Sequence, residues 1–203
     1  MGNAETQDAL WYQDLTFEQE RDWFEQRVKE CEKDLLRFAC YLTGNLDRAR
    51  DLFQEALLRA FKYRHSYNSK YPFQNWVYAI LLNLYRHQFK KEKLLKTFLP
   101  WKNSEGEEEE NFLDCLEFKD DGPEEKVIRS QVMVDLEKVI QQLPLKMREV
   151  VISCDVMGYS YEEASEIIGC PLGTVRSRLH RARRQIKKSM EDIYGKDFLA
   201  SWS

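Results

Sequence analysis

The stretch YSYEEASEIIGCPLGTVRSRLHRARRQIKK, residues 159–188, decides the fold of the C-terminal half. Ser160 and Glu163 have the spacing of a capping box, in which a hydroxyl and a carboxylate satisfy free backbone donors at a helix start. Gly169 is typical of the end of that helix, and Pro171 suits the first turn of the next because it has no N–H to satisfy. Two helices around a tight turn predict a helix-turn-helix.

The second helix of this motif has one apolar and one cationic face. Apolar residues spaced four, three and four apart face the core, and they are Val175, Leu179, Ala182 and Ile186. Residues 173–188 hold seven Lys or Arg and no acid, although the chain has a formal net charge of −4. The outward residues, which we expect at the DNA major groove, are Arg176, Ser177, His180, Arg181, Arg184 and Lys187. A solvated cationic face favoured by the helix dipole is the alternative, but so strong a bias favours DNA contact.

Helical periodicity also organises the N-terminal half. Apolar residues recur at intervals of three and four in three stretches, which predicts helices rather than strands. These stretches are 35–42, 46–61 and 73–84. Asn45 has the place of an N-cap for the second, and YNSKYP at 67–72 separates the second from the third. Residues from about 16 to 95 therefore predict a bundle of three or four helices.

An acidic segment lies between the two halves. Residues 104–125 hold eleven acids and one lysine, with too few apolar residues to offset the entropy of ordering. We therefore expect a flexible acidic linker over residues 97–125, which acts as a plain tether or mimics nucleic acid and competes for a basic groove. The expected fold class is all-α, with an N-terminal helical bundle and a C-terminal helix-turn-helix domain joined by this linker.

A second basic cluster follows an aromatic-rich stretch, YPFQNWVYAILLNLYRHQF at 71–89. Its cations are Arg86, Lys90, Lys91, Lys93 and Lys96, with Glu92 as the one acid among them. Cations that follow phosphates, next to aromatics that stack on unpaired bases, indicate binding of single-stranded DNA. Phe73, Trp76 and Tyr78 taken alone could be core residues, but two basic elements on two helical modules favour DNA reading.

The rest of the composition excludes several classes. The five cysteines, Cys31, Cys40, Cys115, Cys154 and Cys170, have irregular spacing without a Cys-x-x-Cys pair, and the three histidines do not cluster. We therefore expect no metal site and no cofactor. There is no run of eighteen apolar residues and no signal peptide, so we expect a cytoplasmic protein with reduced thiols and no membrane insertion. An enzyme on nucleic acid needs clustered carboxylates or a nucleophile with its base, and no such set is visible.

Three stretches carry a family resemblance when they are taken in order. They are YLTGNLDRARDLFQEALLRAF (41–61), FQNWVYAILLNLYRHQFKKEK (73–93) and LPLKMREVVISCDVMGYSYEEASEIIGCPLGTVRSRLHRARRQIKK (143–188). The chain resembles the extracytoplasmic-function (ECF, group IV) sigma factors of bacterial RNA polymerase over roughly residues 24–95 and 127–190. This resemblance implies sigma domain 2 at 21–96 and sigma domain 4 at 126–192, with an N-terminal extension at 1–20 and a C-terminal tail at 193–203. For both ends we favour disorder.

The resemblance also implies partners and contact residues. The residues that would dock on the coiled-coil clamp of the polymerase β′ subunit are Asp51, Leu52, Phe53, Gln54, Glu55 and Leu58. Those that would read and melt the −10 promoter element are Trp76, Asn83, Arg86, Lys90 and Lys91, and the outward face of the last helix would read the −35 element. The surface near Leu145, Val150, Val151 and Met157 would contact the β flap. An anti-sigma factor that masks both modules is a further expected partner.

We therefore expect an alternative sigma factor that binds core RNA polymerase and directs promoter-specific initiation, and not an enzyme. The alternative is a stand-alone helix-turn-helix regulator, whose front half would serve dimerisation or sensing and which would bind palindromic sites as a symmetric dimer. A pure interaction module that holds another factor would not explain a complete DNA-reading helix.

Overall fold

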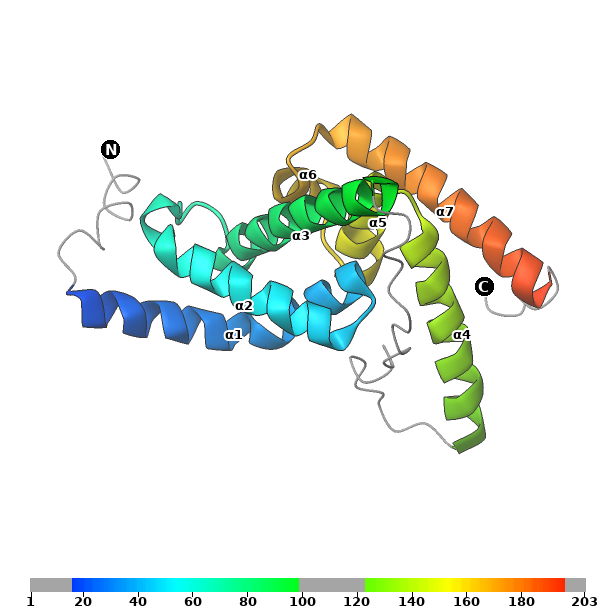
Figure 1. The fold of residues 1–203 in the computed structure, drawn as a ribbon, viewed down its shortest axis with the longest axis horizontal. Coiled ribbons are helices and arrows are strands. Elements are labelled where there is room, and N and C mark those ends of the chain that lie inside the picture. The colour runs from blue at the N-terminus through cyan, green and yellow to red at the C-terminus, as the bar shows by residue number, and fades with distance from the viewer. Residues whose placement is uncertain (1–15, 99–122, 196–203) are drawn as a thin grey trace, which may run out of the picture.

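The computed structural model describes residues 16–98 and 123–195, and every regular element within them is a helix or a helical turn (Figure 1). The first half holds α1 (Phe17–Thr43), α2 (Leu46–Lys62), the 3-10 turn η1 (Arg64–Ser66) and α3 (Phe73–Phe98). The second half holds α4 (Pro123–Gln142), α5 (Leu145–Val151), the π-helical turn η3 (Ile152–Val156), α6 (Tyr161–Ile168) and α7 (Leu172–Tyr194). The all-α prediction is confirmed.

Local signals in the sequence set the helix ends of the first half. A capping box of Thr16 and Gln19 begins α1, and the Gln19 side chain accepts from the Thr16 N–H at 2.9 Å. Gly44 ends α1 with a φ of +68°, a left-handed conformation that costs glycine little. Asn45 then caps α2 by accepting from the Arg48 N–H at 2.9 Å, as its position predicts. Because α1 begins at Phe17, the predicted N-terminal extension ends inside a helix, and residues 1–15 lie outside the described part.

The three long helices of the first half share one apolar core. Leu35, Phe38, Leu52, Tyr78 and Leu81 are fully buried within it. The rings of Phe38 and Tyr78 lie 4.5 Å apart between centroids, a close contact between α1 and α3. Burial of these faces, spaced by three and four residues, is what the apolar periodicity predicts.

The second half contains the predicted helix-turn-helix. Ser160 and Glu163 form the capping box of α6, and Gly169 ends that helix with a φ of +70°. Pro171 is the N-cap of α7, one position before its expected place in the first turn. α7 runs to Tyr194, which places the start of the predicted tail inside a helix, and residues 196–203 lie outside the described part. α3 and α4 likewise extend into the ends of the predicted linker, and residues 99–122 lie outside the described part.

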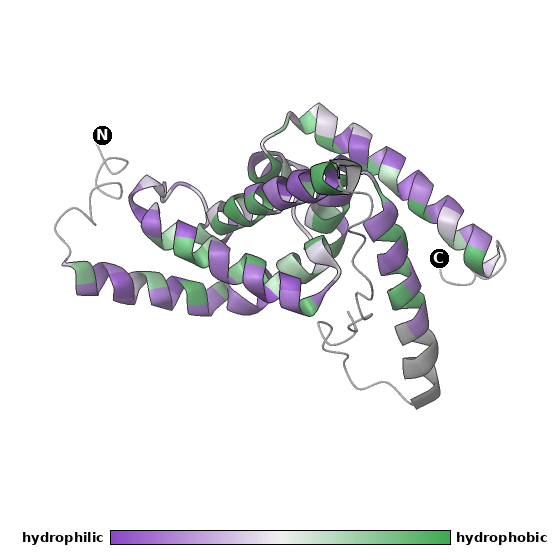
Figure 2. Ribbon diagram, in the orientation of Figure 1, coloured by the Kyte–Doolittle hydropathy of each residue, from purple (hydrophilic) through white to green (hydrophobic). Residues whose placement is uncertain are grey.

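The two halves pack against each other, with α3 between the rest of the bundle and the α5–α6 region (Figure 1). Buried residues of both halves, among them Tyr78, Leu82, Val150, Ile152 and Ile167, belong to one hydrophobic cluster. The Tyr78 and Tyr159 rings meet edge to face with centroids 5.5 Å apart. α7, in contrast, lies along the outside and carries hydrophilic residues over much of its length (Figure 2).

Candidate nucleic-acid and polymerase interfaces

The outward face of α7 is open to solvent. All six residues predicted to meet the −35 element are exposed, namely Arg176, Ser177, His180, Arg181, Arg184 and Lys187. The opposite face is anchored by Val175, Leu179 and Ala182, which are buried against the rest of the helix-turn-helix. A rigid helix thus presents four cations, one hydroxyl and one imidazole in a row, which suits base edges and phosphates of a duplex.

Arg183, a cation of the 173–188 stretch, has a partner on another element that sequence reasoning missed. The Arg183 side chain donates to Asp155 through Nε at 3.0 Å and through Nη2 at 2.5 Å. Hydrogen bonding to the Asp155 carboxylate raises the pKa of Arg183. Asp155 lies 28 residues upstream in η3, so no local spacing in the sequence indicates the pair. Arg183 therefore braces α7 against η3.

The predicted polymerase-docking helix divides into a surface face and a core face. Asp51, Gln54 and Leu58 are exposed, and Glu55 is partly exposed beside them, so these four residues form one face of α2. Leu58 is 72% exposed, a large apolar side chain in polar surroundings. We call these four residues the α2 docking face. Glu55 also forms a salt bridge with the neighbouring Arg59, in which Arg59 Nη2 lies 2.7 Å from Glu55 Oε1.

Leu52 and Phe53 do not belong to this face. Leu52 is fully buried and Phe53 is 9% exposed, and both are part of the bundle core. Their predicted contact with polymerase is therefore not available in this structure, because the apolar periodicity of α2 turns them inward. The surface predicted for the β flap needs the same correction, since Val150 and Val151 are buried, while Leu145 and Met157 are partly exposed.

The predicted −10 residues lie along α3 and differ in accessibility. Asn83, Lys90 and Lys91 are exposed. Trp76 is half-buried, with its ring 5.4 Å from that of Tyr67 between centroids. All of these predicted −10 residues lie on α3, but only some of their side chains are exposed to solvent.

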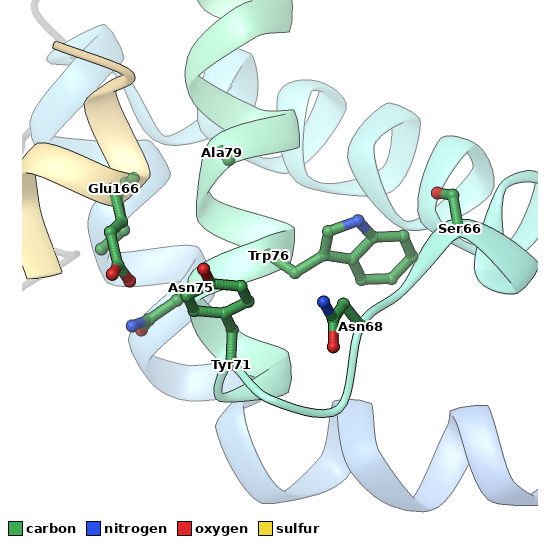
Figure 3. Close-up of a pocket in the computed structure, with 8 residues that line it drawn as sticks. Ser66, Asn68, Tyr71, Asn75, Trp76, Ala79 and Glu166 are labelled. Atoms are coloured by element: carbon green, nitrogen blue, oxygen red, sulfur yellow. The ribbon is translucent and has the colours of Figure 1, made fainter. Parts of the chain in front are cut away.

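Trp76 lines a pocket of about 360 Å³ at the start of α3 (Figure 3). We call it the Trp76 pocket. Its walls are Ser66, Asn68, Tyr71, Asn75, Trp76 and Ala79 from the first half, and Glu166 and Ile167 from α6 of the second. Asn75 is buried, and its Nδ2 has no hydrogen-bond partner among the described residues. An aromatic wall beside amide groups is suited to an unpaired base, whereas the Glu166 carboxylate disfavours a phosphate.

Arg86, which we predicted to hold the DNA backbone, is occupied by the second half of the chain. Its Nε donates to Glu149 Oε1 at 2.7 Å, and its Nη2 donates to Glu149 Oε2 at 2.8 Å and to the Ile168 carbonyl at 3.0 Å. Glu149 is 1% exposed, and hydrogen bonding to it raises the pKa of Arg86. In this arrangement Arg86 is not free for a phosphate, because a carboxylate already occupies its guanidinium.

Next to this pair lies a second polar contact between the halves. The buried Arg148 donates through Nη1 to the Tyr85 hydroxyl at 2.8 Å and to Gln141 Oε1 at 2.7 Å. Gln141 in turn donates to the Tyr41 carbonyl at 2.7 Å. We call the contacts made by Arg86, Glu149, Arg148 and Gln141 the interdomain polar layer. In the sequence, Arg148 and Glu149 stand directly before the apolar Val150 and Val151 of α5, and nothing there names their partners on α3.

Further features bear on reactivity and membrane contact. Burial raises the pKa of the Cys31 and Cys154 thiols to about 11, which disfavours their reactive thiolate forms. Cys31, Cys40, Cys154 and Cys170 are present as thiols, and Cys115 lies outside the described residues. Within the part of the chain that the structure describes, no helix combines the length and the apolar character needed to span a bilayer.

Comparison with known proteins decides the family. Sigma-70 region 2 matches residues 27–94, and Sigma-70 region 4 matches residues 133–186. The chain is 32% identical over 172 residues to the ECF RNA polymerase sigma factor EcfG of Rhodopseudomonas palustris, which covers 81% of this chain and 83% of that protein. This chain belongs to the ECF sigma factors. The ECF sigma factor SigW of Bacillus subtilis is 30% identical over 166 residues, covering 79% of this chain and 86% of SigW.

Three further similarities concern the length and the fold of the chain. The ECF sigma factor SigE of Mycolicibacterium smegmatis is 32% identical over 165 residues, which are 81% of this chain but only 60% of SigE. The solved sigma factor RpoE in complex with the anti-sigma factor NepR from Bartonella quintana matches with a TM-score of 0.66 and 26% identity, over 83% of this chain and 96% of RpoE. CnrH in complex with the cytosolic domain of CnrY shares the fold, with a TM-score of 0.58 at 18% identity, over 85% of this chain and 90% of CnrH.

As an ECF sigma factor, the chain is an alternative sigma factor, a transcription initiation factor for RNA polymerase. The stand-alone regulator is not favoured, because the N-terminal half matches a sigma region and not a separate sensing domain.

Proposed function

We propose that this ECF sigma factor docks on core RNA polymerase through α2 and reads a promoter with two separate helices. In this assignment residues 21–96 form the domain that binds polymerase and the −10 element, and residues 126–192 form the domain that binds the −35 element. The matches to Sigma-70 regions 2 and 4 support this division because they fall inside these two spans.

The α2 docking face carries the proposal. Leu58 has the most exposed side chain among the large apolar residues of the described part, and it sits among Asp51, Gln54 and Glu55, which can meet basic and polar groups. The coiled-coil clamp of the β′ subunit is the partner we assign to this face, with Leu58 as its apolar anchor. The partly exposed Leu145 and Met157 are the side chains we assign to the β flap.

Substitution of Leu58 by Asp tests this assignment. Loss of a central apolar anchor costs about 2–4 kcal/mol, so we expect core polymerase to bind the variant about 30- to 1,000-fold more weakly. The matched control is Leu94→Asp, because Leu94 is also strongly exposed but lies on α3 and not on α2. Binding to purified core polymerase and run-off transcription are the measurements. Equal binding by Leu58→Asp and the native chain would contradict the assignment.

The −35 step needs no rearrangement of the domain. The exposed face of α7 enters the major groove, with Arg176, Ser177, His180 and Arg181 near the base edges and Arg184 and Lys187 near phosphates. Arg is suited to guanine because its fork matches O6 and N7 together.

The −10 step requires that the two halves separate. In the closed arrangement Glu149 occupies Arg86, and α6 contributes a wall of the Trp76 pocket. Binding to polymerase would draw the halves apart, so that Arg86 exchanges the Glu149 carboxylate for a DNA phosphate. Trp76, Asn83, Lys90 and Lys91 would then hold the separated strand, and this binding shifts the duplex towards its open form.

The partners that follow are core RNA polymerase, promoter DNA and an anti-sigma factor. An anti-sigma factor that binds the closed arrangement more tightly than the open one would keep the −10 residues covered. The similarity to RpoE solved with NepR supports this class of partner.

A further inference from the structure

We infer that Glu20 is a positioning residue for −10 recognition, because it fixes the loop that supplies one side of the Trp76 pocket. The inference rests on the proposed function of that pocket. Glu20 lies in the first turn of α1, upstream of residue 27, where the match to Sigma-70 region 2 begins. The family match therefore gives this residue no role.

Glu20 pairs with Arg64 in a largely buried setting. The two side chains are only 11% and 15% exposed. Arg64 donates to Glu20 Oε2 through Nε at 2.8 Å and through Nη2, and its Nη1 donates to the Phe61 carbonyl at 3.0 Å. Since Arg64 opens η1 directly after the end of α2, the pair joins the start of α1 to the beginning of the loop.

Aromatic rings enclose the same guanidinium. It lies over the Phe61 ring at 4.5 Å and over the Phe17 ring at 5.8 Å from the centroids. These contacts leave the Arg64 side chain little rotational freedom. Exposed ion pairs contribute little to stability, but removal of one partner from a buried pair leaves an uncompensated charge. The Glu20–Arg64 pair is therefore a firm attachment point.

The residues that depend on this attachment line the pocket. Ser66, Asn68 and Tyr71 follow Arg64 within seven positions and form one side of the Trp76 pocket (Figure 3). Tyr67 lies between them, and its hydroxyl donates to the Tyr71 carbonyl at 2.8 Å. The loop from 67 to 72 has no regular secondary structure, so tethers of this kind determine its shape.

A second contact from α1 reaches the same loop. The Trp23 ring lies 6.0 Å from Tyr67 between centroids, and Tyr67 in turn lies 5.6 Å from Phe73. The first two turns of α1 thus hold the loop at Arg64 and at Tyr67. A base that enters the Trp76 pocket meets a preformed wall only while both attachments persist.

Four variants of the full chain, assembled with core polymerase, test the inference. They are Glu20→Gln, Glu20→Asp, Arg64→Lys and the control Glu30→Gln, which breaks the exposed Arg27–Glu30 pair (3.3 Å) on the same helix. Initiation rates are compared on matched templates with single base changes at −10 or at −35. Discrimination is the ratio of rates on the native and changed templates.

We expect Glu20→Gln to lower discrimination at −10 by about five- to tenfold, because a small misplacement of a binding wall has large effects. Discrimination at −35 should stay at the native value for every variant, since the predicted −35 residues lie on α7 in the other half of the chain. Glu20→Asp should recover most of the −10 discrimination because it keeps the charge. Glu30→Gln should match the native chain.

Arg64→Lys keeps the charge but loses the fork geometry, and it should reproduce the −10 loss even if Glu20→Gln does not fold. If Glu20→Gln folds and discriminates at −10 as well as the native chain, the inference is wrong. If Glu20→Gln does not fold, native −10 discrimination by Arg64→Lys would overturn the inference in the same way. A change in thermal stability alone decides neither case. A native holoenzyme that is itself indifferent to the −10 bases would overturn the proposed function, and this inference with it.

Discussion

The two helices that we propose to meet DNA, α7 and α3, differ in what covers them. The predicted −35 residues of α7 are all exposed, and their helix lies on the outside of the molecule (Figure 1). α3 lies between the bundle and the second half, its Arg86 is held by Glu149, and its Trp76 pocket has a wall from α6. In the proposed assignment, the same chain therefore presents an open duplex reader and a covered reader of the separated strand. The difference suggests that the chain can find a −35 element before it can hold a −10 element.

The contact that covers α3 combines the apolar cluster shared by both halves with the interdomain polar layer. Arg86, Glu149, Arg148 and Gln141 find partners in each other and in the backbone when the halves are closed. When the halves separate, water or DNA can satisfy the same groups, so opening does not expose a purely apolar surface. An interface made only of leucine and valine would hold the halves together more permanently.

The largest effect in this comparison should come from the open helix. Arg176→Ala removes a base contact worth about 1–3 kcal/mol, so we expect discrimination at −35 to fall about 5- to 150-fold in the holoenzyme. Run-off transcription on templates with single −35 changes measures it. Lys188→Ala is the matched control, since Lys188 is an exposed cation of the same helix that lies outside the predicted −35 set. An equal loss from both variants would show that α7 acts through its overall charge and not through its outward face.

A smaller effect should come from opening the covered helix. Glu149→Gln removes the carboxylate that holds Arg86, and we expect the isolated chain to bind a fluorescent single-stranded −10 oligonucleotide about tenfold more tightly. Fluorescence anisotropy at fixed salt is the measurement. Glu162→Gln is the control, because it removes the same charge from an exposed position on α6. If both variants gain affinity equally, net charge and not the interdomain polar layer limits binding.

The smallest effect should appear in the salt dependence. Lys187→Ala and Lys90→Ala each remove one phosphate contact, so each should lower the slope of log K against log salt by about one. The two variants should differ in the DNA that reveals the change: Lys187→Ala should lower the slope for duplex −35 DNA, and Lys90→Ala should lower it for separated −10 DNA in the holoenzyme. Binding titrations over a range of salt concentrations measure both slopes. An unchanged slope for Lys90→Ala in the holoenzyme would remove that residue from the −10 surface.

Local features of the molecule were predictable from the sequence because their causes are local. The caps at Asn45 and Ser160, the end of α6 at Gly169 and the two faces of α7 all depend on residues within a turn or two. The same periodicity places Leu52 and Phe53 in the core, so the prediction that they contact polymerase was wrong for this arrangement although the sequence held the signal against it.

Contacts across the fold were not predictable in this way. Arg86 and Glu149 are 63 positions apart, and Glu20 and Arg64 are 44 apart. Each pair depends on how helices pack, which the periodicity of a single helix does not specify. The covered state of α3 follows from these pairs, so it became visible only in the structure.

The distance between the two halves, measured by electron–electron double resonance, tests the central claim most directly. Spin labels at the exposed positions Glu32 on α1 and Asp192 on α7 would report that distance in the isolated chain and in the holoenzyme. We predict one narrow population in the isolated chain that matches the closed arrangement, and a clearly different distance once core polymerase is bound. An isolated chain that already shows the distribution of the holoenzyme would contradict the closed −10 reader.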